Sequence, residues 1–592
     1  MRVGNWSWLL GTGLLLSSSA CGLIGADDDP PANPGASDAA KAGAAGRSFG
    51  GGNSGGGERA ASGRGGSDSG APAGGSGFAT GGSSGFGAVA GRATGGSSSA
   101  GSAGSPAPDP DCTAAVKVEG DLVVAPGKEP TVLVSNVWGN LHIQGTASQL
   151  KQLRCLQTVG GSLNLEVSEG DLSALGQLRY VGDDLTIEGN ETIRNLSAFR
   201  SLGSIGRTLV LRDNAALVDL SGMDLLGYLG STLSVSKNPA LSSLHGLEKL
   251  SALSGLDISD NPKLEDLDAL SQVTRTNADI RVENNRALHS VAGLRGFDQA
   301  HTIIIRGSDL LKDLQGLESW TLQSQLSIDS NAGLVSLAGL SGLKQVAVLT
   351  ITENPSLHDL SGLEGVQWLN DVTITNNAKL ENIDALGSSL TEISSFWLEG
   401  SPAVTSLDGL RNLKWVNELT IRSCGVSSLT GLRDMDTIVA RLRLLDTKVK
   451  DLSGLANVGF GGLDLEDNSE LTSLAGLSPI NLNLNHLTLS NNPKLSDLSA
   501  LAMLRTIDNG LELESNAALT SLTGLDSLKS VAWISVVDQP ALTSLASLGS
   551  LKTISQAATF LRNSGLSNCA LQQLVTRCKP MTSQLEGNGP CN

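Results

Sequence analysis

The residues with the widest chemical repertoire in this sequence are six histidines and a set of carboxylates, and neither group is arranged for catalysis. The histidines are His142, His245, His289, His301, His358 and His486. No two of them share one of the repeat units described below, whereas a metal centre or a catalytic pair needs side chains a few ångströms apart. The sequence therefore predicts no metal site and no cofactor.

The carboxylates at expected strand positions are scattered along the chain. They are Asp257, Glu283, Asp329, Asp464, Glu466, Glu512 and Glu514. Parallel β-helix enzymes that act on pectins instead cluster Asp with His, Arg or Lys on adjacent coils. Glu512 with Glu514 is the densest group, and a solvated strand face explains it better than a carboxylate dyad. We therefore expect no catalytic residues and no enzyme activity; a carbohydrate-active β-helix enzyme remains an alternative.

Seven cysteines lie mostly near the ends of the chain. None belongs to a C-x-x-C pair, which argues against a structural zinc site. Such a distribution is typical of an exported protein whose ends are held by disulfides. The formal charge of −18 argues against nucleic-acid binding, because that requires clustered Lys and Arg.

A sequence repeat would provide the elements that position these side chains, and its clearest copy is residues 253–275. Leu256 and Ile258 alternate with polar residues, a turn follows, and apolar residues then recur at every third position. About nineteen copies run from Val137 to Leu561 with a period of roughly 22 to 27 residues, which indicates a solenoid. Glycines within the second half disfavour a sustained helix, so parallel strands joined by turns are expected.

A polar column follows the expected strand in most repeats. Its members are Asn190, Asn214, Asn238, Asn261, Asn285, Asn331, Asn354, Asn377, Asn468, Asn492 and Asn516, with Cys424 in the same place. A buried Asn amide can both donate to and accept from the backbone of neighbouring turns. Leucine-rich repeats accept Asn or Cys at this corner, so Cys424 is interpreted as a buried structural thiol.

The repeat resembles the receptor L-domain, a relative of the leucine-rich repeat, over about 450 residues. Residues 149–190, which include QTVGGSLNLEVSEGDLSAL, match best. The resemblance implies the disulfide Cys112–Cys155. It specifies the fold rather than the function, since the family binds diverse protein ligands. This chain departs from the family in its many uninterrupted coils, so growth-factor binding is not carried over.

The carboxyl end reads as a short capping helix, SNCALQQLVTRC, with Ser567 or Asn568 as its N-cap. Cys569, Cys578 and Cys591 compete for one bridge there. Cys569–Cys591 is favoured, and Cys578–Cys591 stays open.

The amino end reads as an export signal followed by a linker. A basic start and a short apolar run lead to small residues before Cys21, which resemble a bacterial lipobox in which the cysteine is diacylated. Cleavage after Ala20 by an ordinary signal peptidase is the alternative. The Gly/Ser-rich stretch that follows is expected to be a flexible tether.

Five aromatic residues sit at or near the position that opens a coil. They are Tyr180, Tyr228, Trp320, Trp368 and Trp415. Turn packing would explain them, and the alternative is an exposed stripe for contact with a glycan or a peptide.

Together these patterns predict a mainly β fold: a right-handed parallel β-helix-like solenoid, receptor L-domain and leucine-rich-repeat-like, preceded by a disordered tail. The expected domains are a signal peptide (1–20), a lipidated, disordered tether (21–111), the solenoid (112–562) and a disulfide-stapled cap (563–592). The expected function is a lipid-anchored binding or adhesion module at the outer membrane or cell surface, recognising protein or polysaccharide. A secreted form and a structural envelope spacer remain alternatives.

Overall fold

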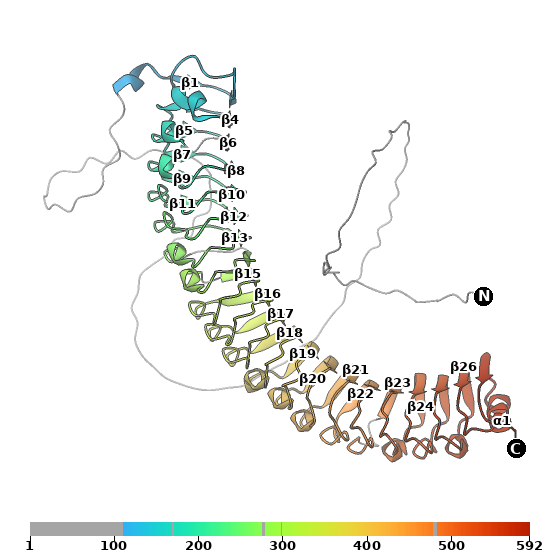
Figure 1. Cartoon of the computed structure of the whole chain (residues 1–592). Coiled ribbons are helices and arrows are strands. Elements are labelled where there is room, and N and C mark those ends of the chain that lie inside the picture. The colour runs from blue at the N-terminus through green and yellow to red at the C-terminus, as the bar shows by residue number, and fades with distance from the viewer. Residues whose placement is uncertain (1–109, 168–170, 275–278, 298, 478–481, 592) are drawn as a thin grey trace, which may run out of the picture. The chain divides into compact units, whose positions relative to one another are not determined.

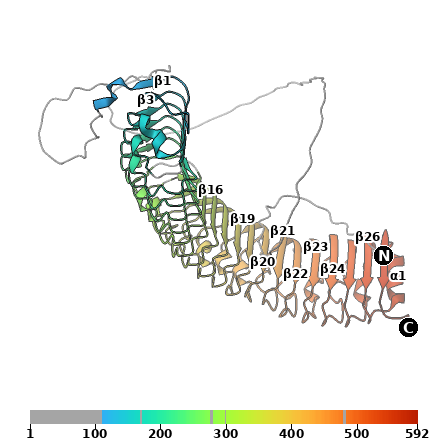
Figure 2. The same ribbon diagram turned by 45° about the horizontal axis from the view of Figure 1, so that its top comes forward.

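The computed structural model describes residues 110–167, 171–274, 279–297, 299–477 and 482–591. The expected signal peptide, Cys21 and nearly all of the tether lie outside these residues. The described chain is a parallel β solenoid of about twenty turns, in which each turn adds one strand to a continuous sheet. Figure 2 shows the later strands, β16 to β26, standing side by side as successive rungs.

The main sheet contains most of the strands, and each strand pairs in parallel with the strand of the next coil. In chain order these strands are β2 (Leu122–Val124), β4 (Leu141–Gly145), β6 (Leu163–Val167), β8 (Leu185–Glu188), β10 (Leu209–Arg212), β12 (Thr232–Ser236), β13 (Gly255–Ser259), β14 (Ile280–Glu283), β15 (Gln299–Arg306), β16 (Thr321–Asp329), β17 (Gln345–Thr352), β18 (Trp368–Thr375), β19 (Glu392–Glu399), β20 (Trp415–Arg422), β21 (Thr437–Leu445), β22 (Gly459–Glu466), β23 (Leu482–Ser490), β24 (Thr506–Glu514), β25 (Ser530–Val537), β26 (Thr553–Leu561) and β27 (Thr582–Glu586). Within the solenoid, the strands line the inner side of its curve (Figure 1).

A second, six-stranded parallel sheet accompanies the early coils. Its strands are β1 (Val116–Val118), β3 (Val134–Val137), β5 (Thr158–Val159), β7 (Tyr180–Val181), β9 (Ser204–Ile205) and β11 (Tyr228–Leu229). From β15 to β26 the corresponding residues join the main strand, which therefore lengthens to eight or nine residues.

The return half of each coil is made of turns and short 3-10 helices. These helices are η1 (Pro110–Ala114), η2 (Ala147–Leu153), η3 (Ser173–Leu175), η4 (Ser197–Phe199), η5 (Asp268–Leu270), η6 (Ala292–Leu294), η7 (Asp384–Ser388), η8 (Asp408–Leu410), η9 (Thr430–Leu432), η10 (Ser499–Leu501) and η11 (Ala546–Leu548). The one α-helix of the described residues, α1 (Asn568–Cys578), follows Ser567, which is its N-cap. None of the helices in the described part has the length and hydropathy of a membrane span.

The leucines of the repeat form one core that runs along the stack. Leu349 and Ile351 of β17 register with Val372 and Ile374 of β18, and all four are buried. Glycine is required where coils approach most closely: Gly339 has φ +110°, and a Cβ there would lie 1.8 Å from the Leu314 carbonyl oxygen. The sequence-based expectation of parallel strands joined by turns is confirmed.

The stack is longer than the repeat pattern. The sequence pattern runs from Val137 to Leu561, whereas β2 pairs with β4 before it and β27 pairs with β26 after it. The repeat pattern does not include these outer rungs because their strands have only three and five residues. Neither strand is followed by the regular leucine turn. The last rung is reached through α1, so the cap also continues the sheet.

Candidate ligand-binding site on the main sheet

A charged cluster lies on the solvent face of the main sheet, over β19 to β23. The register places Trp397, Thr420, Arg443, Asp464 and Thr488 in one column across five successive strands. These positions alternate with the buried leucines, so their side chains leave the opposite face of the sheet. Each residue comes from a different coil. The local sequence determines on which face of the sheet its side chain lies, and the register between strands determines which side chains become neighbours.

Asp464 is the centre of this cluster and is only 4% exposed. Its carboxylate lies 3.4 Å from Arg441 Nε and 3.5 Å from Arg443 Nε, and it forms a short contact with His486 Nε2. Arg441 Nη2 lies 3.1 Å from His486 Nδ1. Because a guanidinium can only donate, Nδ1 accepts and the ring proton sits on Nε2, directed at Asp464.

This arrangement favours binding over catalysis. Both ring nitrogens of His486 are engaged, one by Arg441 and one by Asp464, so the imidazole is not available as a general base. Each guanidinium has five donors, and the contacts seen here involve two of its nitrogens: Nε of both faces Asp464, Arg441 Nη2 faces His486, and Arg443 Nη1 lies 3.7 Å from Glu418 Oε2. The remaining donors suit an anionic or hydroxyl-rich ligand.

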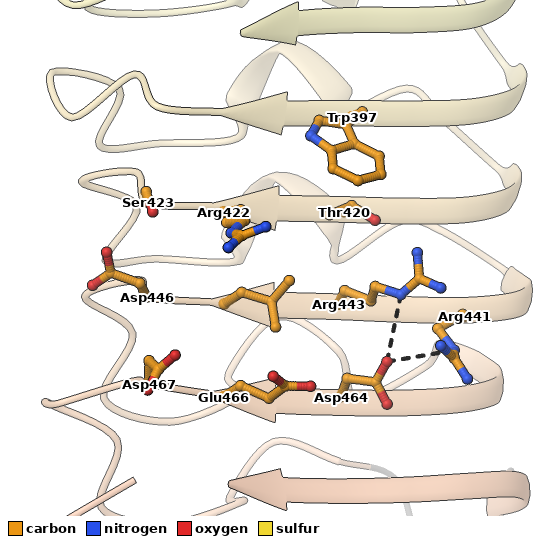
Figure 3. A pocket seen from close by; sticks show the side chains of 11 residues that line it. Trp397, Thr420, Arg422, Ser423, Arg441, Arg443, Asp446, Asp464, Glu466 and Asp467 are labelled. Carbon is orange, nitrogen blue, oxygen red and sulfur yellow. Dashed lines mark ion pairs between the residues drawn. The ribbon is translucent and has the colours of Figure 1, made fainter. Parts of the chain in front are cut away.

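The cluster opens into a cavity of about 580 Å³ on the sheet surface. Figure 3 shows Trp397 and Thr420 beside Arg443, while Asp446, Glu466 and Asp467 gather toward the ends of their strands. The Trp397 indole N–H donates to Glu399 Oε2 at 2.8 Å, which orients the ring. The cavity therefore offers an aromatic surface, guanidinium donors and carboxylate acceptors within one open site.

Two neighbouring glutamates are unusually basic. Burial raises the pKa of Glu466, and the charges of Asp464, Asp467 and Glu512 raise it further. Burial likewise raises the pKa of Glu512, with Glu514 and Asp464 adding to the effect. Ionisation of these two glutamates at neutral pH therefore destabilises the folded state in this part of the sheet.

We expect Glu512→Gln to stabilise the protein at pH 7 and to have no effect near pH 4. A raised carboxyl pKa means that the folded state binds the proton more tightly, so stability falls as pH rises from the ordinary glutamate pKa through the folded one. Thermal unfolding of both proteins from pH 4 to 8 measures this. A difference that persists unchanged at pH 4 would contradict the electrostatic explanation.

The sequence pattern alone does not reveal this cluster. Asp464 is one of the carboxylates scattered along the expected strands, and Arg441, Arg443 and His486 are not among the predicted site residues. Stacking of the coils brings these four residues together and buries Asp464. Aligning each strand on its Leu-x-Leu motif would have placed Arg443 opposite Asp464.

The expected polar column forms a continuous hydrogen-bond ladder over much of the stack. The backbone N–H of Asn331 donates to Asn354 Oδ1 at 3.1 Å, and the N–H of Asn354 donates to Asn377 Oδ1 at 3.0 Å. The same pattern links Asn190, Asn214, Asn238, Asn261 and Asn285, and later Asn468, Asn492 and Asn516. Ser308, Ser401, Thr447, Gln539 and Asn563 occupy the same buried column, although the sequence analysis did not select them.

The repeats and this ladder together define the architecture. The chain has a leucine-rich-repeat-like fold. No family model matches the sequence, and no curated protein matches it. Among solved structures, the solenoid is similar to an internalin (inlF) from Listeria monocytogenes, at 16% identity over 66% of this chain and 88% of that one, with a TM-score of 0.26. It is also similar to a TLR13–ssRNA13 complex, at 15% identity over 80% of each chain, with a TM-score of 0.25.

Within this leucine-rich-repeat-like solenoid, Cys424 occupies the ladder position. Its thiol is buried and donates to the Arg422 carbonyl oxygen at 3.1 Å. Burial is the main cause that raises the pKa of Cys424 to about 11. A thiol of that pKa is a weak nucleophile at neutral pH.

We expect Cys424 to resist alkylation by iodoacetamide at pH 8 in the folded protein. At that pH only about one thiol in a thousand is ionised, and the side chain is enclosed. Mass spectrometry of the Cys424 peptide, with and without urea, measures the protection. The exposed thiol of a Met503→Cys variant serves as the reactive control, and equal rates at both sites would contradict the expectation.

Both ends of the solenoid carry a disulfide. Cys112 pairs with Cys155, as the receptor L-domain resemblance implies, and Cys569 pairs with Cys591. Cys578 is free and buried, and its thiol donates to the Leu551 carbonyl oxygen at 3.2 Å. Among all the described residues, no group of three or more His, Cys, Asp or Glu is placed to hold a metal ion.

The five aromatic residues do not form one exposed stripe. Tyr180 and Tyr228 are exposed on the small sheet, Trp368 is exposed at the start of β18, and Trp415 is half-buried at the start of β20. Trp320 is buried, and its indole N–H donates to the Leu294 carbonyl oxygen at 3.2 Å. The binding interpretation is therefore wrong for Trp320, whose ring fills the core of its coil.

Proposed function

We propose that this leucine-rich-repeat-like solenoid is a non-enzymatic binding module whose ligand is a protein or polysaccharide. The observation that carries the proposal is the Asp464 cluster beside the cavity over β19 to β23. Placing charges at partly buried positions costs desolvation energy, which a purely structural sheet face could avoid with Ser or Thr. The same register column does avoid it at Thr350 of β17 and Thr373 of β18.

The test is a binding screen of the full chain against glycan and envelope-protein panels, followed by Arg443→Gln. We expect at least a tenfold loss of affinity for whichever ligand the screen identifies, because one charge-assisted contact is typically worth about 1.5 to 3 kcal/mol. Arg306→Gln is the matched control, since Arg306 lies on the same sheet and pairs with Asp329 at 3.0 Å, outside the cavity. No binding anywhere on the panels would favour the structural envelope spacer.

We further propose that the module is exported and attached to the outer membrane or cell surface. Two disulfides are typical of proteins that fold in an oxidising compartment. The attachment would run from a diacylated Cys21 through the tether of residues 21–111 to the solenoid of residues 112–562 and its cap, 563–592. Palmitate labelling of the wild type and Cys21→Ala, with and without globomycin, tests the anchor. An unlabelled wild type would indicate a secreted protein instead.

A further inference from the structure

A separate surface on the small sheet carries exposed aromatic side chains at a regular spacing. The chain has only two tyrosines, and both lie in the same register column: Tyr180 of β7 and Tyr228 of β11 each pair with Ser204 of β9. They are 41% and 53% exposed. Figure 1 shows β5, β7, β9 and β11 stacked in order on the side opposite the main sheet.

Trp138 adds a third exposed ring toward the amino end, in the register column next to that of the tyrosines. It directly follows β3, is 48% exposed, and lies on the same face of the sheet, because it is separated from Asn136 by the buried Val137. The strands that bear Trp138, Tyr180 and Tyr228 are β3, β7 and β11, with β5 and β9 between them. An exposed aromatic ring therefore occurs on every second rung.

Two rungs of a parallel sheet span about 9 to 10 Å. In a linear β-1,4-linked chain of pyranoses, successive sugars are turned over, so the same ring face returns once per disaccharide. The length of that disaccharide repeat is close to the two-rung spacing. The apolar C–H face of every second sugar could then stack on one aromatic ring.

Small side chains separate the rings along the tyrosine column. Thr158 and Ser204 occupy the intervening rungs and offer small hydroxyl groups. A parallel column of glycines runs beside them: a Cβ at Gly182 or Gly206 would come within 1.9 or 1.8 Å of a carbonyl oxygen in the preceding coil. These glycines therefore cannot carry side chains. The Tyr228 hydroxyl oxygen would lie 3.3 Å from a Cβ at Gly230, so the Tyr228 ring reaches over the glycine column.

The stretch between Tyr180 and Tyr228 selects the class of ligand. Its register columns hold Ser204 and two glycines and no ionisable group apart from the tyrosine hydroxyls, whereas the exposed Lys117 of β1 continues the tyrosine column beyond Asn136 at the amino end. An anionic polymer would find no cation in the columns between the two tyrosines, whereas a neutral glycan needs only ring stacking and hydroxyl hydrogen bonds there.

We propose that Trp138, Tyr180 and Tyr228 form a binding strip for a neutral, linear β-1,4-linked polysaccharide that runs along the solenoid axis. The strip lies on the small sheet of the early coils, whereas the Asp464 cavity lies over β19 to β23. The two sites share no residue, so this inference goes beyond the proposed function and stands or falls separately.

Isothermal titration calorimetry of the full chain tests the ligand class. The probes are cellohexaose, xylohexaose, mannohexaose and chitohexaose, all β-1,4-linked, with α-1,4-linked maltohexaose as the comparison of identical sugar composition to cellohexaose. We expect at least one β-1,4-linked probe to bind at least about tenfold more tightly than maltohexaose. Binding of none of the four, or equal binding of maltohexaose, would overturn the proposal.

Three variants test the site and its spacing. Tyr180→Ala and Tyr228→Ala should each weaken binding about tenfold. The double variant Ser204→Tyr/Tyr228→Ser keeps two tyrosines but moves them to adjacent rungs, and it should bind as weakly as Tyr228→Ala. Full binding by this double variant would refute the two-rung match.

Two controls separate this site from others. Trp368→Ala removes an equally exposed aromatic ring from the main sheet and should leave glycan binding unchanged. Arg443→Gln should also leave it unchanged, which distinguishes failure of this proposal from failure of the proposed function. Because Tyr180 and Tyr228 are exposed, the thermal unfolding of their alanine variants should match that of the wild type. If these folded variants bound the glycan as tightly as the wild type, the binding strip would be rejected.

Discussion

Replacing Asn354 with alanine is expected to lower the free energy of unfolding by about 2 to 5 kcal/mol, since each buried polar group left without a partner costs about 1 to 3 kcal/mol. Asn354 is fully buried. Its Oδ1 accepts the backbone N–H of Asn331, and its Nδ2 donates to the Ile328 carbonyl oxygen at 3.0 Å. Alanine would leave that N–H and that carbonyl oxygen without partners in a site that water does not reach.

Urea unfolding and amide hydrogen exchange together measure this effect. A long repeat array need not unfold in one step, so exchange in the coils around residues 331–377 reports local opening that a single midpoint could hide. Asn195→Ala is the matched control, because the Asn195 side chain accepts from Ser197 N–H in an exposed turn. We expect the control to cost less than about 1 kcal/mol. Similar losses in both variants would contradict the importance of the ladder.

The second large effect is expected for Asp464→Asn, which should destabilise the sheet by about 2 to 3 kcal/mol and abolish binding at the cavity. Removing one member of a buried ion pair typically costs about 3 to 5 kcal/mol, and we take a smaller value because Arg441 and Arg443 are partly exposed. The two guanidiniums would repel each other without the carboxylate and lose their orientation toward the cavity. His486 would also exchange a charged acceptor for a neutral amide oxygen, while Arg441 would still hold its tautomer.

Asp446→Asn is the control for that prediction. It makes the same chemical change on the rim of the same cavity, but Asp446 is exposed and has positive φ, a conformation that asparagine tolerates. We expect unchanged stability, as measured by thermal unfolding, and at most a small change in binding. If both variants lost stability equally, total charge rather than the buried cluster would be responsible.

Much of the architecture could be predicted because it depends on local periodicity. Leu256 and Ile258 alternate with polar residues, and that alternation alone places them inside a half-buried strand. Asn261 follows at a fixed distance, and a polar residue that recurs after every buried strand must satisfy backbone groups of the next coil. The same logic assigned Cys424 to the ladder, where its thiol donates to backbone carbonyls.

The candidate site was harder to predict because its members interact across coils. Arg441 and His486 are 45 residues apart, yet their side chains are 3.1 Å apart. Within its own coil, each is an isolated polar residue on the outward face of a strand. Trp320 shows the opposite case. It lies three residues after Leu317, near the position that opens a coil, and its side chain is buried in the core rather than exposed.

The repeat, the parallel strands and the buried polar column follow from the sequence alone, because they depend on hydrophobic period and on the need to satisfy backbone hydrogen bonds. Which outward side chains meet depends instead on how the coils stack. Contacts such as Asp464 with Arg443, or the alternate-rung spacing of Tyr180 and Tyr228, depend on the register between neighbouring strands. That register arises when coils of slightly different length stack on a common core, so the pairs follow from packing rather than from spacing along the chain.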